Sequence, residues 1–569
     1  GLSALETLNL SGNQLSGAIP SELGGLSALK KLNLRGNQLS DLGLGNVQHA
    51  LEFVSKFDPD GRTYVPSEKV LDLRGNPWKM PPEAVVEQGL EATKIFLGDV
   101  QKASDNGAQV RSLKLLKVVL VGAESAGKTS LMRSIIKGAS SPTEGTLYEA
   151  STVGIELSTY LLQGTEIEFY DCAGQVDYAG MHQTFLTRRA LYLLVWDVQE
   201  FRGLDERNLM ELVQAVDRNI MRWLYNLHLR APEATVILVA NKCDGSVANK
   251  CETSLADFEE TTTKMERRVK HLLEEWQKRR KDGDVTVVRL LDGVSRTSCV
   301  NYGGIDGLVE RISGEGATSI LVPPAWDLAL KILDALRSGG DPLRAARAHL
   351  GLNEKRAAAG ETHKIVTNTF TTKKKLLKLW EDIVRQVSEE LQSPEDRTAV
   401  SNWKNALNGA LWISEFAGQI LRIDRDEGLF LDVEWLSKVL SPILSHKLHP
   451  DDFPTIDLKC QRDNLVHRGV LRWNFAQHLW RDVLTPVQKG SKGRVIESLF
   501  RVLLKLGVII PLGRPAFLSD RRGSHTSHGV GESKDMLVIM RLSEKRSDEQ
   551  QESIVSSFAN VHRDCREVT

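Results

Sequence analysis

The sequence predicts a multidomain chain: an α/β solenoid of leucine-rich repeats, then a doubly wound α/β domain, then a mixed, mainly α-helical domain. Three observations predict this order. Leucines recur with a period of 24 residues at the start of the chain, apolar strands alternate with helices from Ser112, and that alternation stops after Gly314. A chain of 569 residues is long enough for about three or four domains that each bury a core of their own.

Composition narrows the possible partners and the compartment. With 41% hydrophobic and 26% charged residues and a net charge of −1, the chain is typical of globular protein and has no basic field that would favour nucleic acid or an anionic membrane. No apolar run approaches the roughly 18 residues of a membrane-spanning helix, so we expect no integral membrane segment. The six cysteines show no C-x-x-C pairing, which predicts free thiols and a cytoplasmic location. Because the chain begins at Gly1 inside a repeat, we expect further domains beyond its ends.

The repeat frame is L-x-x-L-x-L-x-x-N-x-L. Its first two copies are Leu2, Leu5, Leu8, Leu10, Asn13 and Leu15, then Leu26, Leu29, Leu32, Leu34, Asn37 and Leu39. In this frame alternate leucines face inward from a short strand, and the asparagine can bond the turn backbone of its neighbours. A third copy starts at Leu71, and residues 84–97 predict a helix that caps the solenoid. We therefore expect repeats with their cap over 1–100, a linker over 101–112, and a protein partner on the exposed face of the repeats.

One stretch fits the pattern G-x-x-x-x-G-K-[ST] and lies between an apolar strand at 115–121 and a helix-forming segment. The motif is Gly122-Ala123-Glu124-Ser125-Ala126-Gly127-Lys128-Thr129, and we include the next residue, Ser130, in the binding set. A Gly-rich turn of this kind lets backbone N–H groups cradle a phosphate at the positive end of a helix. Lys128 would neutralise the β- and γ-phosphates, and the Thr129 hydroxyl would hold Mg²⁺. Taken alone, the pattern also fits a chance match in a Gly-rich turn.

Further motifs fall at the ends of other predicted strands, which we expect over 153–162, 165–171, 190–197, 234–240 and 284–291. Asp171 ends one of them and can hold the hydration shell of Mg²⁺, while Gly174 can bring its N–H against the γ-phosphate. Thr152 supplies a hydroxyl at the edge of the next strand, placed to close on Mg²⁺ when the γ-phosphate is present. Thr143 and Thr146 are rivals for that role.

A base-recognition motif, Asn241-Lys242-Cys243-Asp244, follows the strand at 234–240. A carboxylate such as that of Asp244 accepts two hydrogen bonds from guanine, whereas adenine offers no such donor pair, so the motif favours GTP over ATP. Asn241 would brace the loops, and the stem of Lys242 would lie on the base. A further strand ends at Val294-Ser295-Arg296, where backbone N–H groups of Ser295 and Arg296 could meet the guanine carbonyl oxygen. Four ordered motifs, each at a strand end, argue against a chance match.

These motifs resemble those of Ras-like small G proteins, and such a domain between leucine-rich repeats and a long further segment is similar to the Roco family. In that family the G domain is called Roc and the next domain COR. Local stretches carry the resemblance further: Leu191 to Val198 resembles the Roc strand after switch II, and Phe430 to Leu436 and Leu499 to Leu512 resemble COR segments. The resemblance implies a Roc GTPase domain over 113–316 and a COR domain, complete or not, over 317–569.

The resemblance also implies an activity and a partner. It implies hydrolysis of GTP to GDP and phosphate, with Mg²⁺ and with Lys128 on the phosphates, and a homodimer formed through COR. Gln175 stands where Ras-like proteins orient the attacking water. A rival mechanism takes an arginine from the dimer partner; Arg188, Arg189 and Arg296 are candidates, and none is assigned. The alternative function is a scaffold that binds GTP without turning it over and recruits partners through the repeats.

Helical stripes dominate after Gly314. One comprises Trp326, Ala329, Leu330, Leu333 and Leu336; another Leu376, Leu379, Trp380, Ile383, Val387 and Leu391; a third Leu499, Leu503 and Leu506, ended by Gly507. All three predict core-facing helices. With a short strand at 469–473 they could form a winged-helix unit, for which the neutral net charge favours protein contact over DNA. His562-Arg563-Asp564 copies the start of a kinase catalytic loop, but without a VAIK-like lysine or D-F-G we treat it as coincidence.

Overall fold

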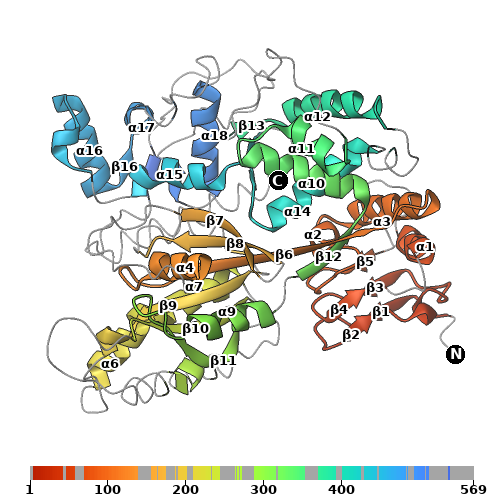
Figure 1. The fold of residues 1–569 in the computed structure, drawn as a ribbon, viewed down its shortest axis with the longest axis horizontal. Helices are drawn as coiled ribbons and strands as arrows, with labels where there is room; N and C mark the ends of the chain where they lie inside the picture. Colours follow the sequence, from red (N-terminus) through yellow and green to blue (C-terminus); the bar gives the residue numbers. More distant parts are fainter. Residues whose placement is uncertain are drawn as a thin grey trace.

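A computed structural model gives the architecture of most of the chain (Figure 1). The described residues are 4–42, 47–57, 70–138, 155–162, 165–174, 186–187, 190–201, 209–231, 234–243, 263, 266–267, 269–271, 274, 288–315, 318–352, 370–391, 397, 400, 402–423, 428–444, 448–481, 484, 492–505, 508–511 and 536–538. They form a short repeat solenoid, a central sheet with helices on both faces, and a mainly helical part. Within these ranges no helix is both long and apolar enough to cross a membrane.

Three short parallel strands in register form one sheet of the repeats: β1 (Thr7–Asn9), β3 (Lys31–Asn33) and β5 (Val70–Asp72). A second pair joins β2 (Ser16–Ala18) to β4 (Gln38–Asp41). Asn37 and Asn76 are buried, and their amides donate to Leu10 O and Leu34 O, both at 2.9 Å. The frame asparagines therefore join each repeat to the one before it.

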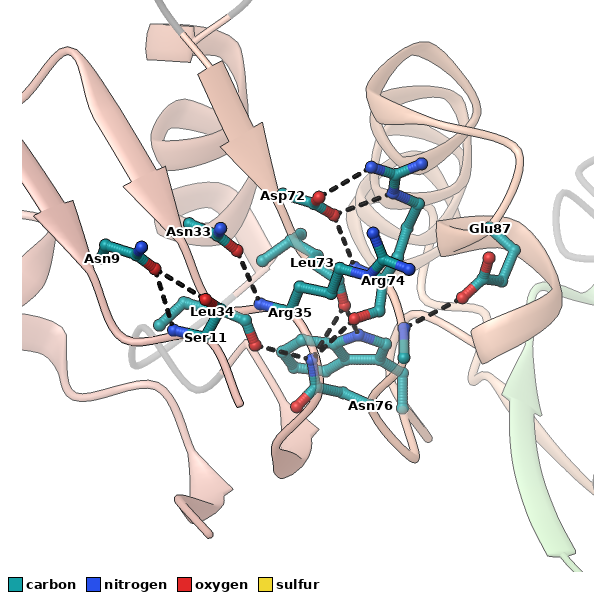
Figure 2. Close-up of polar contacts among 12 residues, drawn as sticks. Asn9, Ser11, Asn33, Leu34, Arg35, Asp72, Leu73, Arg74, Asn76 and Glu87 are labelled. Atoms are coloured by element: carbon teal, nitrogen blue, oxygen red, sulfur yellow. Dashed lines mark hydrogen bonds and ion pairs between the residues drawn. The ribbon is translucent and has the colours of Figure 1, made fainter. Parts of the chain in front are cut away.

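A second polar ladder fixes the turn after each of these strands (Figure 2). Asn9, Asn33 and Asp72 occupy equivalent positions, and each side chain accepts a hydrogen bond at 3.1 Å from the backbone N–H two residues further along. Asp72 also pairs with the Arg74 guanidinium at 2.7 Å, which holds the pKa of that carboxyl below its ordinary value. The repeated position thus carries the same short-range bond in all three repeats.

The cap of the repeats contains α1 (Val47–Phe57), α2 (Glu83–Val86) and α3 (Leu90–Asp105). The single capping helix expected over 84–97 is therefore two helices, because Gly89 between them has a φ of 103° that a helix does not allow. α3 runs into the segment expected as a linker, and residues 106–110 alone connect it to the next strand.

The central sheet carries the strand-end motifs. Its order is β11-β10-β9-β6-β8-β7, and β12 pairs antiparallel with the first half of β6. The strands are β6 (Arg111–Val121), β7 (Ile155–Leu162), β8 (Thr165–Cys172), β9 (Leu191–Asp197), β10 (Thr235–Asn241), β11 (Arg289–Arg296) and β12 (Thr318–Val322). β7 runs antiparallel to β8, whereas β8, β6, β9, β10 and β11 are mutually parallel. β6 lies where the strand order reverses, the point at which such sheets bind ligands.

Helices cover both faces of this sheet. α4 (Lys128–Lys137) and α9 (Ile305–Gly314) pack on one face. α6 (Leu209–Val216) and α7 (Arg222–Arg230), joined by a π-helix over 217–221, pack on the other. This is the doubly wound layout that the alternation of strands and helices predicts.

The part after the sheet begins with α10 (Pro324–Arg337), α11 (Pro342–His349), α12 (Lys373–Ser388) and α14 (Trp403–Phe416). Their predicted apolar stripes are buried, except for the half-buried Leu379, and they share one core with the repeats and the cap. A small sheet of β13 (Phe370–Thr371), β15 (Leu429–Phe430) and β14 (Leu421–Arg422) follows, and then α15 (Val433–Leu444). Segments on either side of the sheet domain in sequence therefore fold against each other.

The last described elements have the order helix, strand, helix, helix, strand, strand. They are α16 (Ile456–Arg468), β16 (Val470–Leu471), α17 (Trp473–Leu479), α18 (Lys492–Lys505), β17 (Ile509–Pro511) and β18 (Met536–Val538), with the sheet order β16-β18-β17. This order matches a winged-helix unit. The strand expected over 469–473 is shorter, because Trp473 already begins a helix. Leu506 and Gly507 lie outside the described residues, as does the kinase-like triplet at 562–564.

Candidate nucleotide-binding site

The turn between β6 and α4 has a backbone that glycine alone fits at two positions. Gly122 has a φ of 146° and Gly127 a φ of 86°. A Cβ on Gly122 would lie 1.9 Å from the carbonyl oxygen of Val195 on β9, and one on Gly127 would lie 2.4 Å from Asn241 Nδ2. Because these two residues have no Cβ, the loop backbone lies directly against β9 and against the side chain of Asn241. The loop leads into the N-terminus of α4.

Lys128 is folded back over this loop. Its side chain is buried, and Nζ donates to Gly122 O at 3.0 Å and to Ala123 O at 2.7 Å. Burial lowers the pKa of Lys128, while the negative charge of Asp171 opposes that shift. The amine therefore lies against the loop that would cradle a phosphate.

The end of β8 meets the start of α4. The Thr129 hydroxyl donates to Asp171 Oδ2 at 2.5 Å, and Asp171 is fully buried. A Cβ on Gly174 would lie 2.5 Å from Glu124 N and 2.6 Å from Ala123 O, so the turn after Asp171 rests directly on the phosphate loop. A hydroxyl and a carboxylate oxygen side by side are ligands that Mg²⁺ prefers. Within the described ranges, no group of three or more His, Cys, Asp or Glu side chains could hold a metal by itself.

Asn241, the last residue of β10, ties three loops together. It is 1% exposed, and its Nδ2 donates to Ala126 O in the phosphate loop at 3.0 Å. Its Oδ1 accepts from Thr297 Oγ1 at 3.1 Å and from Cys299 Sγ at 3.7 Å. Cys243 N donates to Thr297 O at 3.1 Å and adds a backbone link between the same two loops. The phosphate side and the base side of the site are therefore held in fixed relation.

Lys242 follows with a positive φ of 63°, and its Nζ pairs with Asp197 Oδ2 at 2.7 Å. Its Cε would lie 3.9 Å from a Cβ on Gly127, so the stem passes beside the phosphate loop. Gln199 Nε2 donates to Lys242 O at 3.1 Å. Asp197 ends β9 and Gln199 lies two residues further on. Neither residue was predicted, although a polar side chain at a strand end is a signal for such a role.

Ser295 and Arg296 are the last two residues of β11, the strand end expected from the sequence, and their contact with the guanine carbonyl oxygen stays a prediction. β11 carries a bulge at Gly293, which has a φ of 81°, and the bulge shifts its register against β10. The Ser295 hydroxyl accepts from Arg311 Nη1 at 2.6 Å. Thr297 and Cys299 follow directly and bond to Asn241. Sequence reasoning missed them because a contact between two separate strand ends leaves no mark in either strand.

The remaining predicted residues fall into two groups. Glu124 and Ser125 are exposed at the tip of the phosphate loop, Ala126 is buried beneath it, and Ser130 lies half-buried in the first turn of α4. Outside the described residues lie Thr143, Thr146, Thr152, Gln175, Arg188, Arg189 and Asp244.

The fold and the site together define a P-loop nucleotide-binding protein. Residues 117–244 match the family model described as Ras of Complex, Roc, domain of DAPkinase, and residues 3–46 match leucine-rich repeats in two copies. The chain thus matches a Roc domain model and, ahead of it, a leucine-rich-repeat model.

Individual relatives cover parts of the chain. The probable serine/threonine-protein kinase pats1 of Dictyostelium discoideum is 25% identical over 264 residues, which are 42% of this chain and 7% of that protein. Leucine-rich repeat serine/threonine-protein kinase 1 of Mus musculus is 27% identical over 189 residues, 31% of this chain and 8% of that protein. Rab-like protein 2A of Mus musculus is 26% identical over 132 residues, 23% of this chain and 53% of that protein. The chain thus spans less than a tenth of the two kinases.

A solved structure with a similar outline is that of Methanosarcina barkeri Roco2 RocCORdC bound to GDP. It is 15% identical in sequence and has a TM-score of 0.41, over 76% of this chain and 98% of that one.

Proposed function

We propose that this chain is a guanine-nucleotide switch that binds GTP and hydrolyses it to GDP and phosphate. The observation that carries the proposal is the meeting of three features at the carboxyl ends of neighbouring strands. They are the phosphate loop after β6, the Thr129–Asp171 pair at the end of β8, and Asn241 at the end of β10. This is the arrangement that GTP hydrolysis requires, with phosphate, metal and base each reached from a different strand.

Each part of the site has a role in this proposal. The backbone N–H groups of the loop and the N-terminus of α4 bind the β- and γ-phosphates. Lys128 moves its amine from the two loop carbonyls to the phosphate oxygens. Lys242 lays its stem along the base, and Asp244 accepts the two guanine donors that adenine lacks. Asn241 positions the loops and does not touch the reacting atoms.

The metal and the water are assigned to four side chains. Thr129 and Asp171 would hold Mg²⁺, directly or through its water shell, and Thr152 would join them when the γ-phosphate is present. When bound, Mg²⁺ neutralises charge on the phosphates. Gln175 orients the attacking water, unless an arginine from a second copy of the chain completes the site.

Single-turnover kinetics test the proposal. Fluorescent GDP and GTP analogues measure binding, and phosphate release from excess enzyme measures hydrolysis. We expect Gln175→Leu to bind GTP but release phosphate at least about tenfold more slowly. Binding by the parent chain with no phosphate release would contradict hydrolysis and leave the GTP-binding scaffold. Asp244→Asn should weaken the binding of GTP and strengthen the binding of xanthosine triphosphate. Unchanged GTP affinity would refute the assignment of Asp244 to guanine recognition.

We also propose the domain organisation, the partners and the location of the chain. The repeats with their cap over 1–100 would hold a protein partner, the Roc domain would occupy 113–316, and a COR domain over 317–569 would form a homodimer. Cys172, Cys243, Cys299 and Cys460 are reduced cysteines, which fits the cytoplasmic location that we propose. Mass in solution, measured with GDP and with a non-hydrolysable GTP analogue, tests the dimer; a monomer with both nucleotides would contradict it.

A further inference from the structure

Helix α14 lies between the cap of the repeats and the central sheet (Figure 1). It has 14 residues, which at 1.5 Å per residue span about 21 Å. One of its faces packs on α10, and it also contacts α2 and α3 of the cap. Its two ends are bonded to different parts of the chain.

The N-terminal end of α14 is bonded to the cap. Asp99 of α3 is 7% exposed, and it accepts from Asn402 Nδ2 at 3.1 Å and from Trp326 Nε1 at 3.0 Å. Asn402 is the N-cap residue directly before α14, and its side chain makes no cap bond to its own helix. Burial raises the pKa of Asp99, and the hydrogen bond from Trp326 opposes that shift. A carboxylate at this end of a helix is favoured by the helix dipole.

The C-terminal end of α14 is bonded to the sheet. Lys117 on β6 donates from Nζ to Ala417 O at 3.1 Å, and the same amine lies 4.0 Å from the centre of the Tyr170 ring. Gln419 Nε2 donates to Glu168 Oε1 on β8 at 2.8 Å. Lys117 and Glu168 are paired across the two strands. A donor at this end of a helix satisfies one of its last carbonyl groups, so one end of α14 is held by an acceptor and the other by donors.

These sheet residues lie just upstream of the nucleotide site. Lys117 precedes Gly122 by five residues on β6, and Glu168 precedes Asp171 by three on β8. Strands rise about 3.3 Å per residue, so Lys117 is roughly 17 Å from the phosphate loop along a stiff path. Close packing fixes the helix sideways: a Cβ on Gly409 would lie 2.2 Å from the Trp326 ring. Because closely packed interiors transmit displacement, we expect a shift at one end of α14 to reach the other.

We infer that α14 couples the nucleotide site to the repeats, so that nucleotide binding stabilises the cap helix α3 and a ligand on the repeats changes nucleotide affinity. This rests on the proposed function, because it takes guanine nucleotide as the ligand of the sheet. A ligand that binds only the folded sheet lowers the population of every partly unfolded state in which the sheet is disrupted. If α3 unfolds locally only after α14 has separated from Lys117 and Glu168, bound nucleotide also slows hydrogen exchange of the α3 amides. The coupling is reciprocal by linkage.

Hydrogen–deuterium exchange of the whole chain tests the inference. Peptides from α3 are compared without nucleotide and with GDP and Mg²⁺ at about 100 times the Kd, which fluorescent GDP measures on the same sample. We expect GDP to slow exchange in α3 by about 5-fold or more, against a ceiling of about 100-fold for full coupling. Lys117→Met should bind GDP yet lose this protection. Lys404→Met, which removes an exposed charge from the same helix, should keep it.

A second variant acts at the other end of the helix and keeps the test valid if Lys117→Met does not fold. Asn402→Gly removes the donor to Asp99, and glycine accepts the φ of 53° found there. It too should lose the protection of α3. GDP binding with unchanged exchange in α3, or protection that survives both variants, overturns the inference alone. Failure of the parent chain to bind GDP overturns the proposed function as well, and the fluorescence titration detects that separately.

Discussion

Replacing Asn241 by alanine should loosen the nucleotide site at its centre. The change removes the hydrogen bonds with Ala126 O, Thr297 Oγ1 and Cys299 Sγ, at a position that is 1% exposed. Each neutral bond contributes about 0.5–1.5 kcal/mol, and a buried carbonyl left without a donor costs about 1–3 kcal/mol. We expect a total loss of about 2–4 kcal/mol. If half of that is lost from nucleotide binding, GDP affinity falls by about 5- to 30-fold.

Two measurements separate stability from binding in this variant. Fluorescent GDP titration gives the Kd. Thermal unfolding without nucleotide gives the stability of the sheet domain, whose Tm we expect to fall by about 5–10 °C. Asn226→Ala is the matched control: it removes an amide that donates to Arg222 O at 3.0 Å on the surface of α7, and should change stability by less than about 0.5 kcal/mol. A folded Asn241→Ala protein whose Kd stays within about twofold of the parent value would refute the role of this side chain.

Three further changes have defined outcomes. Gly122→Ala places a Cβ 1.9 Å from Val195 O and should cost about 3 kcal/mol in urea unfolding, whereas Gly307→Ala, with nothing within 4 Å, should be neutral or stabilising by up to about 1 kcal/mol. Thr129→Ala should abolish the difference in GDP affinity between Mg²⁺ and EDTA; an unchanged difference would exclude Thr129 as a ligand. Burial lowers the pKa of Lys117 from 10.5 to about 7, so unfolding takes up a proton between these values and stability rises from pH 7 to pH 9. Lys117→Met should remove this rise, which is at most about 1.4 kcal/mol per pH unit; an unaltered pH profile would contradict the buried amine.

The sequence predicts well whatever depends on contiguous residues. The phosphate loop needs glycines at fixed spacing because the backbone conformation is local, so the motif at 122–129 carries its own geometry. Strands β6 to β10 of the central sheet and the apolar stripes of α10 and α12 are predicted for the same reason, because burial imposes periods of two and 3.6 residues. The last strand is expected over 284–291, whereas β11 is Arg289–Arg296. The leucine-rich frame fixes the buried asparagines Asn37 and Asn76.

What the sequence does not predict depends on contacts between distant segments. The bulge at Gly293 shifts the register of β11 against β10, and no periodicity marks it. The break at Gly89 divides the cap into two helices because one glycine takes a positive φ, which composition alone does not reveal. The bonds from Asp99 to α14 and from Lys117 to Ala417 join residues some 300 positions apart. Such pairs follow from the packing of whole elements and leave no local signal.

The central claim is that the turn at 122–129 binds a guanine nucleotide. Competition against fluorescent GDP with Mg²⁺ present tests it most directly. GDP should displace the probe at a concentration at least about 100-fold below that of ADP, since only guanine offers two donors to a carboxylate. Equal displacement by ADP, or no binding of the probe to a folded chain, would contradict the account.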